Sequence, residues 1–297
     1  MEGIYIFLFL LGLIAGSFLN VVSLRYKPEF YLFQNTGGRS KCPHCGKKID
    51  WLELFPVLSF VFLLGKCRKC GKRISWQYPL VEILTGIVTA GVPFVLNKMY
   101  FAKQLFLIGE PIGWFLALSV FFILSFYFLI LAAIIDYRFK IVPNEINLAL
   151  TLLGLAVVFV LNYFGKFGLV EGSFLGGYSS MFGLREWGVL INHLIAMGLS
   201  FFLFFIIFFF TQGKGMGMGD VKLAGALGIL FGWPDTLLLI ILAFIIGAAV
   251  GIKMIVKKEA KKGTMIPFSP FLVVSSFLVF FFGETILSNY FSLFGLF

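Results

Sequence analysis

The stretch from residue 112 to 135, IGWFLALSVFFILSFYFLILAAII, contains no charged residue and is followed at once by Asp136. A helix of about 20 mostly apolar residues is long enough to cross the hydrocarbon core of a bilayer. Similar stretches recur along the chain, at residues 4–24, 79–97, 145–163, 189–211, 221–233, 236–256 and 266–283. We therefore expect an all-α polytopic membrane protein with about eight transmembrane helices. The stretch 221–233 is short and glycine-rich, which predicts a short or broken helix ending in a tight turn.

The composition agrees with this fold class and excludes others. Of the 297 residues, 60% are hydrophobic and only 13% are charged. Soluble domains carry about 25% charged and about 45–50% apolar residues. A soluble globule of this length cannot hide so much apolar surface, and a disordered chain would be far more polar.

The positive charges predict the orientation in the membrane. Of the 24 Lys and Arg residues, 20 fall in the segments 25–78, 136–144, 212–222 and 253–263, and the others are Lys98, Lys103, Lys166 and Arg185. Basic segments are retained on the cytoplasmic side, so the N-terminus is expected outside. The first apolar run lacks the basic n-region of a cleaved signal peptide. The net charge of +10 therefore indicates membrane topology, and no nucleic-acid reader motif accompanies it.

All four cysteines lie in the predicted cytoplasmic loop between the first two spans. Cys42-Pro-His-Cys45 and Cys67-Arg-Lys-Cys70 are two CxxC pairs separated by 21 residues. This arrangement is typical of a structural zinc site with four thiolate ligands, and disulfides are rare in the cytoplasm. The Gly that follows each pair suits a reversal of the chain. We expect a small zinc-ribbon-like loop; the alternative is four reduced thiols without a metal.

That loop also contains an apolar stretch, Trp51–Leu64. It is expected either to lie on the membrane surface or to fold back onto the cysteine pairs.

Two of the four aspartates border apolar spans. In the predicted topology, Asp136 and Asp220 both lie at the cytoplasmic end of a span. Acidic groups at such positions are functional candidates. If two carboxyl groups are brought together, one retains its proton, and the pair then activates water as base and acid. The alternative is that each aspartate only caps a helix.

Three alternate glycines precede the second aspartate, in Gly215-Met-Gly-Met-Gly219. The bare backbone of Gly217 and Gly219 would allow an extended substrate to approach and add as a strand, with Met216 and Met218 as an adaptable apolar lining. A phosphate-binding loop would require a Walker or GxGxxG pattern, and neither is present.

Taken together, these segments resemble the type IV prepilin peptidases, bifunctional membrane enzymes of the GxGD aspartic protease class. The resemblance covers nearly the whole chain. It is carried by Gly16-Ser-Phe-Leu-Asn-Val21, the four cysteines, Ala133-Ile-Ile-Asp136 with Ile141-Val-Pro-Asn144, Gly217-Met-Gly-Asp220-Val-Lys222, and Ile266-Pro-Phe-Ser-Pro-Phe271. The chain departs from the family pattern at Ser269, where Gly is expected.

The resemblance implies an activity and its residues. The enzyme would remove the basic leader from prepilins or pseudopilins at the cytoplasmic face of a bacterial inner membrane, with Asp136 and Asp220 as the catalytic pair. It would then methylate the new N-terminus using S-adenosylmethionine. Residues 1–100, with the zinc loop 25–78, would serve methyl transfer, and residues 101–297 would form the peptidase. Within the first part, Gly16, Ser17 and Asn20 belong to the segment associated with methyl transfer.

The polar residues Glu53, Lys66 and Glu82 are weaker candidates for the methyl-transfer region, and structural roles explain them equally well. The residues that bind S-adenosylmethionine cannot be read from the sequence. Prepilin precursors and membrane lipid are the expected partners, and no pattern indicates an oligomeric state.

Three other readings remain open. One is a GxGD intramembrane protease without methyltransferase activity. Another is a transporter, which would show inverted repeats and acidic groups near mid-membrane. The third is a membrane-anchored zinc adaptor whose aspartates are simple helix caps.

Overall fold

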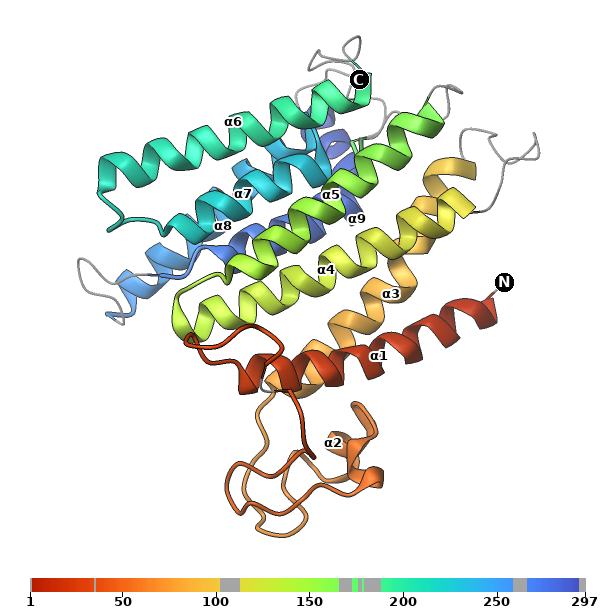
Figure 1. The fold of residues 1–297 in the computed structure, drawn as a ribbon, viewed down its shortest axis with the longest axis vertical. Coiled ribbons are helices and arrows are strands. Elements are labelled where there is room, and N and C mark those ends of the chain that lie inside the picture. Colours follow the sequence, from red (N-terminus) through yellow and green to blue (C-terminus); the bar gives the residue numbers. More distant parts are fainter. Residues whose placement is uncertain are drawn as a thin grey trace. The chain divides into compact units, whose positions relative to one another are not determined.

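The computed structural model describes residues 2–34, 36–101, 113–165, 173–175, 178, 188–258 and 266–293. The secondary structure of these residues is helical, apart from two isolated β-bridges (Figure 1). The chain divides into two compact units, Met1–Lys98 and Met99–Phe297. Each unit is described separately below.

The first unit contains two long helices, α1 (Glu2–Arg25) and α3 (Gln77–Phe101). The loop between them holds a 3-10 turn, η1 (Trp51–Leu54), and a short helix, α2 (Leu58–Phe62). Glycines allow α1 to pass close to α3: a Cβ atom on Gly12 would lie 2.7 Å from the Cα atom of Gly86. Small residues at such crossings bring membrane helices into backbone contact.

The apolar stretch in the loop does not cover the cysteines. Its large side chains stay exposed, including Trp51 at 69%, Phe62 at 82% and Leu64 at 82%. These side chains therefore do not form an apolar cover over the cysteine pairs, and the stretch contacts the first pair through a polar group, Glu53.

The second unit consists of six helices: α4 (Gly113–Phe139), α5 (Asn144–Gly165), α6 (Gly188–Thr211), α7 (Met218–Phe231), α8 (Asp235–Val256) and α9 (Ser269–Leu293). Helix α7 packs chiefly against α5 and α6, beside which it lies in Figure 1. Its residues from 223 to 231 are buried. A Cβ atom on Gly228 would lie 2.6 Å from the carbonyl oxygen of Ala196, so glycine is required where α7 meets α6.

The eight expected helices are present, and seven of those described are long and apolar enough to cross a membrane. The exception is α7, which has 14 residues and ends at Gly232, where φ is +73°. Helix α9 continues to Leu293, beyond the expected end at 283, because hydropathy marks the apolar core and not the last helical turn. Lys103, Lys166, Arg185 and residues 259–265, used in the charge count, lie outside the described part.

A buried carboxyl group fixes the segment that precedes α6. The Asp235 side chain at the start of α8 is fully buried. Its Oδ1 atom accepts hydrogen bonds from the N–H of Phe174 at 2.9 Å and from the Ser173 hydroxyl at 3.2 Å. Asp235 comes four residues after the last residue of α7, so it lies at the end of α7 opposite to Asp220.

Candidate functional site

Asp136 lies in the last turn of α4 and is only 3% exposed. Its Oδ2 atom accepts two hydrogen bonds from the first residue of α9, one from the Ser269 hydroxyl at 2.8 Å and one from the Ser269 N–H at 3.2 Å. Ser269 is itself fully buried. The carboxyl group is therefore held by two donors from a helix that is remote in sequence.

Asp220 lies in the first turn of α7 and is 8% exposed. Its backbone N–H donates to the carbonyl of Gly217 at 3.1 Å. Its Oδ1 atom is buried and has no hydrogen-bond partner among the described residues.

Polar contacts with α5 fix the start of α7. The Lys222 ammonium group donates to Oδ1 of Asn144 at 2.8 Å, and Nδ2 of Asn147 donates to the carbonyl of Gly219 at 3.4 Å. Both contacts join residues more than 70 positions apart in the sequence. They hold the first turn of α7, which carries Asp220, against α5.

The second unit brings the two aspartates together at one end of its helices. Asp136 comes from the end of α4 and Asp220 from the start of α7, and the charge of Asp136 acts directly on the Asp220 carboxyl group. Two buried carboxyl groups within electrostatic range do not ionise independently. The arrangement is chemically suited to activating a water molecule between a base and an acid.

The glycine strip before Asp220 differs from the expectation of three bare, extended residues. Helix α7 begins at Met218, so Gly219 is helical, and a Cβ atom on it would lie 3.2 Å from that of Val142. Gly217 is extended, with φ −78° and ψ 153°, and a Cβ atom there would meet nothing closer than the Asp220 Oδ2 atom at 3.8 Å. Met216 is buried. Residues 214–216 form bends, so Gly217 is the glycine of this strip that has an extended backbone.

The four cysteines form two knuckles with the same backbone pattern. In each, the N–H of the first cysteine donates to the carbonyl five residues later, and the N–H of the following Gly donates back to that cysteine, all at 2.9 Å. Gly46 and Gly71 adopt φ values of +67° and +68°, which glycine adopts without strain. The expected role of these two glycines is confirmed.

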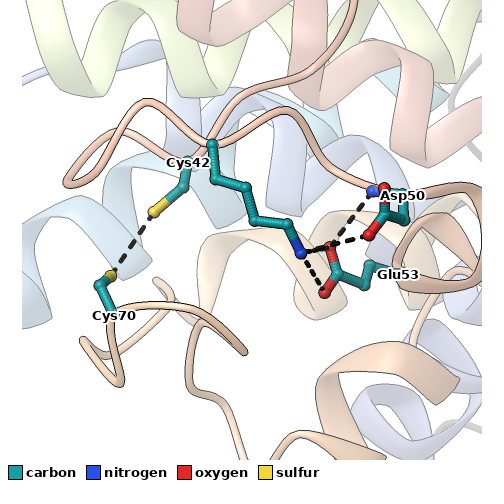
Figure 2. Close-up of polar contacts among 5 residues, drawn as sticks. Cys42, Asp50, Glu53 and Cys70 are labelled. Carbon is teal, nitrogen blue, oxygen red and sulfur yellow. Dashed lines mark hydrogen bonds and ion pairs between the residues drawn. The ribbon is translucent and has the colours of Figure 1, made fainter.

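The geometry of the four thiol groups fits a metal ion. The sulfur atoms of Cys42, Cys45, Cys67 and Cys70 all lie within 4.8 Å of one another, and those of Cys42 and Cys70 are 4.0 Å apart (Figure 2). In a tetrahedral zinc site with four thiolates, neighbouring sulfur atoms are about 3.8 Å apart. Hydrogen bonds from the backbone N–H groups of Cys70 and Lys69 lower the pKa of Cys67 to about 6, whereas desolvation and hydrogen bonds with the neighbouring thiol groups raise the pKa of Cys70 to about 11. A thiolate is therefore favoured at Cys67, and a bound metal ion would favour it at the other cysteines.

An ion-pair cluster joins the first knuckle to η1. The Lys47 ammonium group lies 3.2 Å from Asp50 and 3.1 Å from Glu53 (Figure 2). Hydrogen bonds with Glu53 and Asp50 raise the pKa of Lys47 above its usual value. Glu53, one of the weaker candidates for methyl transfer, therefore has a structural partner.

The segment that the resemblance associated with methyl transfer has packing roles in this structure. A Cβ atom on Gly16 would lie 2.7 Å from the Cα atom of Glu82, so Gly16 lets α1 approach α3. Nδ2 of Asn20 donates to the carbonyl of Tyr78 at 3.1 Å. Oε2 of Glu82 accepts the N–H of Val57 at 2.8 Å and thereby ties α3 to the loop.

Two comparisons place the chain among known proteins. Residues 10–95 match the bacterial peptidase A24 N-terminal domain, and residues 123–252 match the type IV leader peptidase family. The prepilin leader peptidase/N-methyltransferase of Xanthomonas campestris pv. campestris is 31% identical, over 96% of this chain and 94% of that protein. The chain belongs to the type IV leader peptidase family.

Other members of this leader peptidase family show the same extent of similarity. The prepilin leader peptidase/N-methyltransferases of Stutzerimonas stutzeri and Pseudomonas aeruginosa are each 29% identical, over 94% and 95% of this chain and 91% of either relative. No solved structure matches the chain. Asp136 and Asp220 fall within the leader peptidase match, and the four cysteines fall within the N-terminal domain match.

Sequence reasoning missed the donor to Asp136. Ser269 was noted only as a departure from the family pattern, and nothing in the local sequence indicates that it bonds a residue 133 positions away. Asn147 and its contact with Gly219 were also missed. A buried polar residue next to an apolar span is the only signal for either.

Proposed function

We propose that this protein is a membrane aspartic endopeptidase that removes the basic leader from type IV prepilins or pseudopilins. It then methylates the new N-terminus with S-adenosylmethionine as the donor. The observation that carries the proposal is the pair of buried aspartates that α4 and α7 bring together in a member of the leader peptidase family. Its relatives are named for both activities.

The proposed cleavage needs only the two carboxyl groups and water. The ionised carboxylate takes a proton from water as the oxygen attacks the scissile carbonyl carbon. The protonated carboxyl group donates to the carbonyl oxygen, and the leaving amine then takes up a proton as the C–N bond breaks. Burial excludes bulk water and strengthens these electrostatic interactions.

The backbone before α7 is suited to hold the substrate. Residues from Gly215 to Gly217 lie outside the helix, and Gly217 is three positions before Asp220. The carbonyl of Gly217 already accepts the N–H of Asp220, so a substrate peptide would approach by passing over this side-chain-free residue, which would place its scissile bond near the carboxyl groups. Gly217 leaves room for such a peptide. Gly219 allows the first turn of α7 to lie close to Val142 and so helps to position Asp220.

We propose that the four-cysteine centre binds zinc in a structural role. Four thiolates fill a tetrahedral shell and leave no position for a substrate. The first part of the chain, residues 1–100 with Gly16, Ser17 and Asn20, would serve methyl transfer, and residues 101–297 would form the peptidase. When bound, S-adenosylmethionine supplies an electrophilic methyl group to the new amine.

The charge distribution supports a cytoplasmic position for both sites. The segments that contain the cysteines and that follow α4, α6 and α8 carry most of the Lys and Arg residues. Such segments are retained in the cytoplasm and attract anionic lipid. The proposed substrate would place its leader at this face, with its apolar helix in the bilayer.

The test uses purified protein in liposomes with a pilin-like substrate, with and without S-adenosylmethionine, and records product masses. We expect loss of the leader and gain of one methyl group. Asp136→Asn and Asp220→Asn should each abolish cleavage. Asp235→Asn, at a buried aspartate at the other end of α7, is the matched control and should still cleave.

Each other result has a definite meaning. Cleavage without methylation would indicate a GxGD protease without the second activity. If folded wild-type protein does not cleave, or if the two Asn variants cleave normally, the proposed function is wrong.

A further inference from the structure

Asp136 and Asp220 lie in unlike hydrogen-bonding environments, although both are buried carboxyl groups. Oδ2 of Asp136 accepts two donors from Ser269, at 2.8 Å and 3.2 Å. The Asp220 carboxyl group faces one backbone donor, the N–H of Gly217, but its Oδ1 atom is buried and has no donor among the described residues. Hydrogen bonds donated to a carboxylate favour its ionised form, whereas a protonated carboxyl group is itself a donor and tolerates the lack of one.

From this asymmetry we infer that Asp136 is the ionised member of the pair and Asp220 the protonated member, and that Ser269 is the positioning residue that fixes this assignment. The inference rests on the proposed peptidase function. It assigns Asp136 as the base that takes the proton of the attacking water. It assigns Asp220 as the acid that donates a proton to the carbonyl oxygen.

Every proton that moves in the proposed reaction has a donor and an acceptor. The water oxygen forms a bond to the carbonyl carbon, its proton moves to Asp136, and the proton of Asp220 moves to the carbonyl oxygen. When the C–N bond breaks, the proton on Asp136 passes to the leaving amine. Asp220 recovers a proton from the hydroxyl groups of the intermediate as the new carboxylic acid forms. No further reactant is needed.

Other charged groups near the pair do not replace Ser269. On α4, Arg138 lies over the Phe139 ring at 5.3 Å, and Lys140 follows the helix. On the neighbouring helices, Lys222 of α7 is bonded to Asn144, and Glu145 of α5 is an acid. The hydrogen-bonding groups that act on the Asp136 carboxyl group are the hydroxyl and the N–H of Ser269. The Ser269 donors are therefore what stabilises its negative charge.

The first test is the pH profile of cleavage by wild-type enzyme and Ser269→Ala. The variant keeps the backbone donor at 3.2 Å and loses the hydroxyl donor at 2.8 Å. A hydrogen bond to a charged group is strong enough that its loss changes an ionisation equilibrium by about tenfold. We expect the ratio of wild-type to variant rates to grow by about tenfold from the plateau into the acidic limb. Ser269→Thr keeps a hydroxyl and should restore the wild-type profile.

Ser276→Ala is the matched control because it removes another buried serine hydroxyl of α9. That hydroxyl donates to the carbonyl of Leu272 at 2.8 Å, within its own helix, and touches neither aspartate. The control should follow the wild-type profile. A shift of the alkaline limb in Ser269→Ala, an equal fall at every pH or no change would overturn the inference.

A second measurement does not depend on turnover or on the stability of the serine variants. Infrared difference spectra of the folded protein compare wild type with the Asp220→Asn variant at neutral pH. Asp220→Asn should remove a protonated-carboxyl band and leave the carboxylate bands in place, because the remaining Asp136 keeps its Ser269 donors. Loss of a carboxylate band instead would overturn the assignment of the proton, even if the wild-type protein fails to cleave any pilin and the proposed function is wrong.

Discussion

Gly217 is a glycine that the resting structure does not require. Its φ of −78° and ψ of 153° are available to any residue, and a Cβ atom there would meet nothing within 3.8 Å. If the proposed substrate passes over this residue, the glycine is needed for the bound peptide and not for the fold. Gly217→Ala tests this directly, because it adds one methyl group beside the Asp220 carboxyl group.

The expected change in stability is small. Alanine is a poorer helix N-cap than glycine by several tenths of a kcal/mol, but it lowers the entropy of the unfolded chain by about 0.4–1 kcal/mol. These effects oppose each other, so the unfolding free energy should change by less than about 0.5 kcal/mol. A methyl group forced against a bound peptide costs about 1–3 kcal/mol, which is a loss of about 5- to 150-fold in kcat/KM.

The assay is the initial rate of leader removal, measured together with thermal unfolding of the same sample. Gly225→Ala is the control on the same helix: its Cβ atom would make ordinary contact with Phe201 at 3.5 Å, and cleavage should be retained. Gly219→Ala is expected to lower stability as well as activity, because its Cβ atom would press on Val142 at 3.2 Å. If Gly217→Ala is stable and cleaves at the wild-type rate, the reasoning about substrate approach is refuted.

Three further changes test other parts of the structure. Cys70→Ser should lower the zinc content, measured by atomic absorption, and abolish methylation while leader cleavage continues; equal loss of both activities would contradict a separate role for the first unit. Gly228→Ala should lower the unfolding free energy by about 1–3 kcal/mol in thermal melts, since its Cβ atom would lie 2.6 Å from the carbonyl oxygen of Ala196; an unchanged melt would show that α6 and α7 adjust freely. Asp235→Leu should cost about 1–3 kcal/mol because the buried N–H of Phe174 loses its acceptor, whereas Asp235→Asn keeps an acceptor and should cost less.

The features that local sequence determines were predicted well. Apolar runs of sufficient length predicted the helices, and the spacing of each CxxC pair with its following glycine predicted the knuckles. Both features depend on residues that are close together in the chain. The start of α7 was not anticipated. The alternate glycines suggested a strip along which a substrate adds as a strand, but the apolar run after Asp220 allows the helix to begin at Met218, so Gly219 is helical.

Contacts between distant segments could not be predicted. The bond from Ser269 to Asp136 joins residues 133 positions apart, and that from Asn147 to Gly219 joins residues 72 apart. No periodicity encodes such a pair, since it depends on how α4, α5, α7 and α9 pack. The expectation that Asp136 and Asp220 meet came from a likeness to other proteins and from topology, and the structure supplies the side-chain partners.

The shortness of α7 has a consequence for the lipid around the protein. A helix of 14 residues is about 21 Å long, which is about 9 Å less than the thickness of a typical hydrocarbon core. The rest of that depth is left to the non-helical backbone on either side of α7, whose N–H and C=O groups cannot face acyl chains. A hydrophobic mismatch of this kind is relieved by local thinning of the bilayer or by entry of water. Cleavage by this enzyme should therefore depend on acyl-chain length, and a thicker membrane should hinder access of water to Asp220.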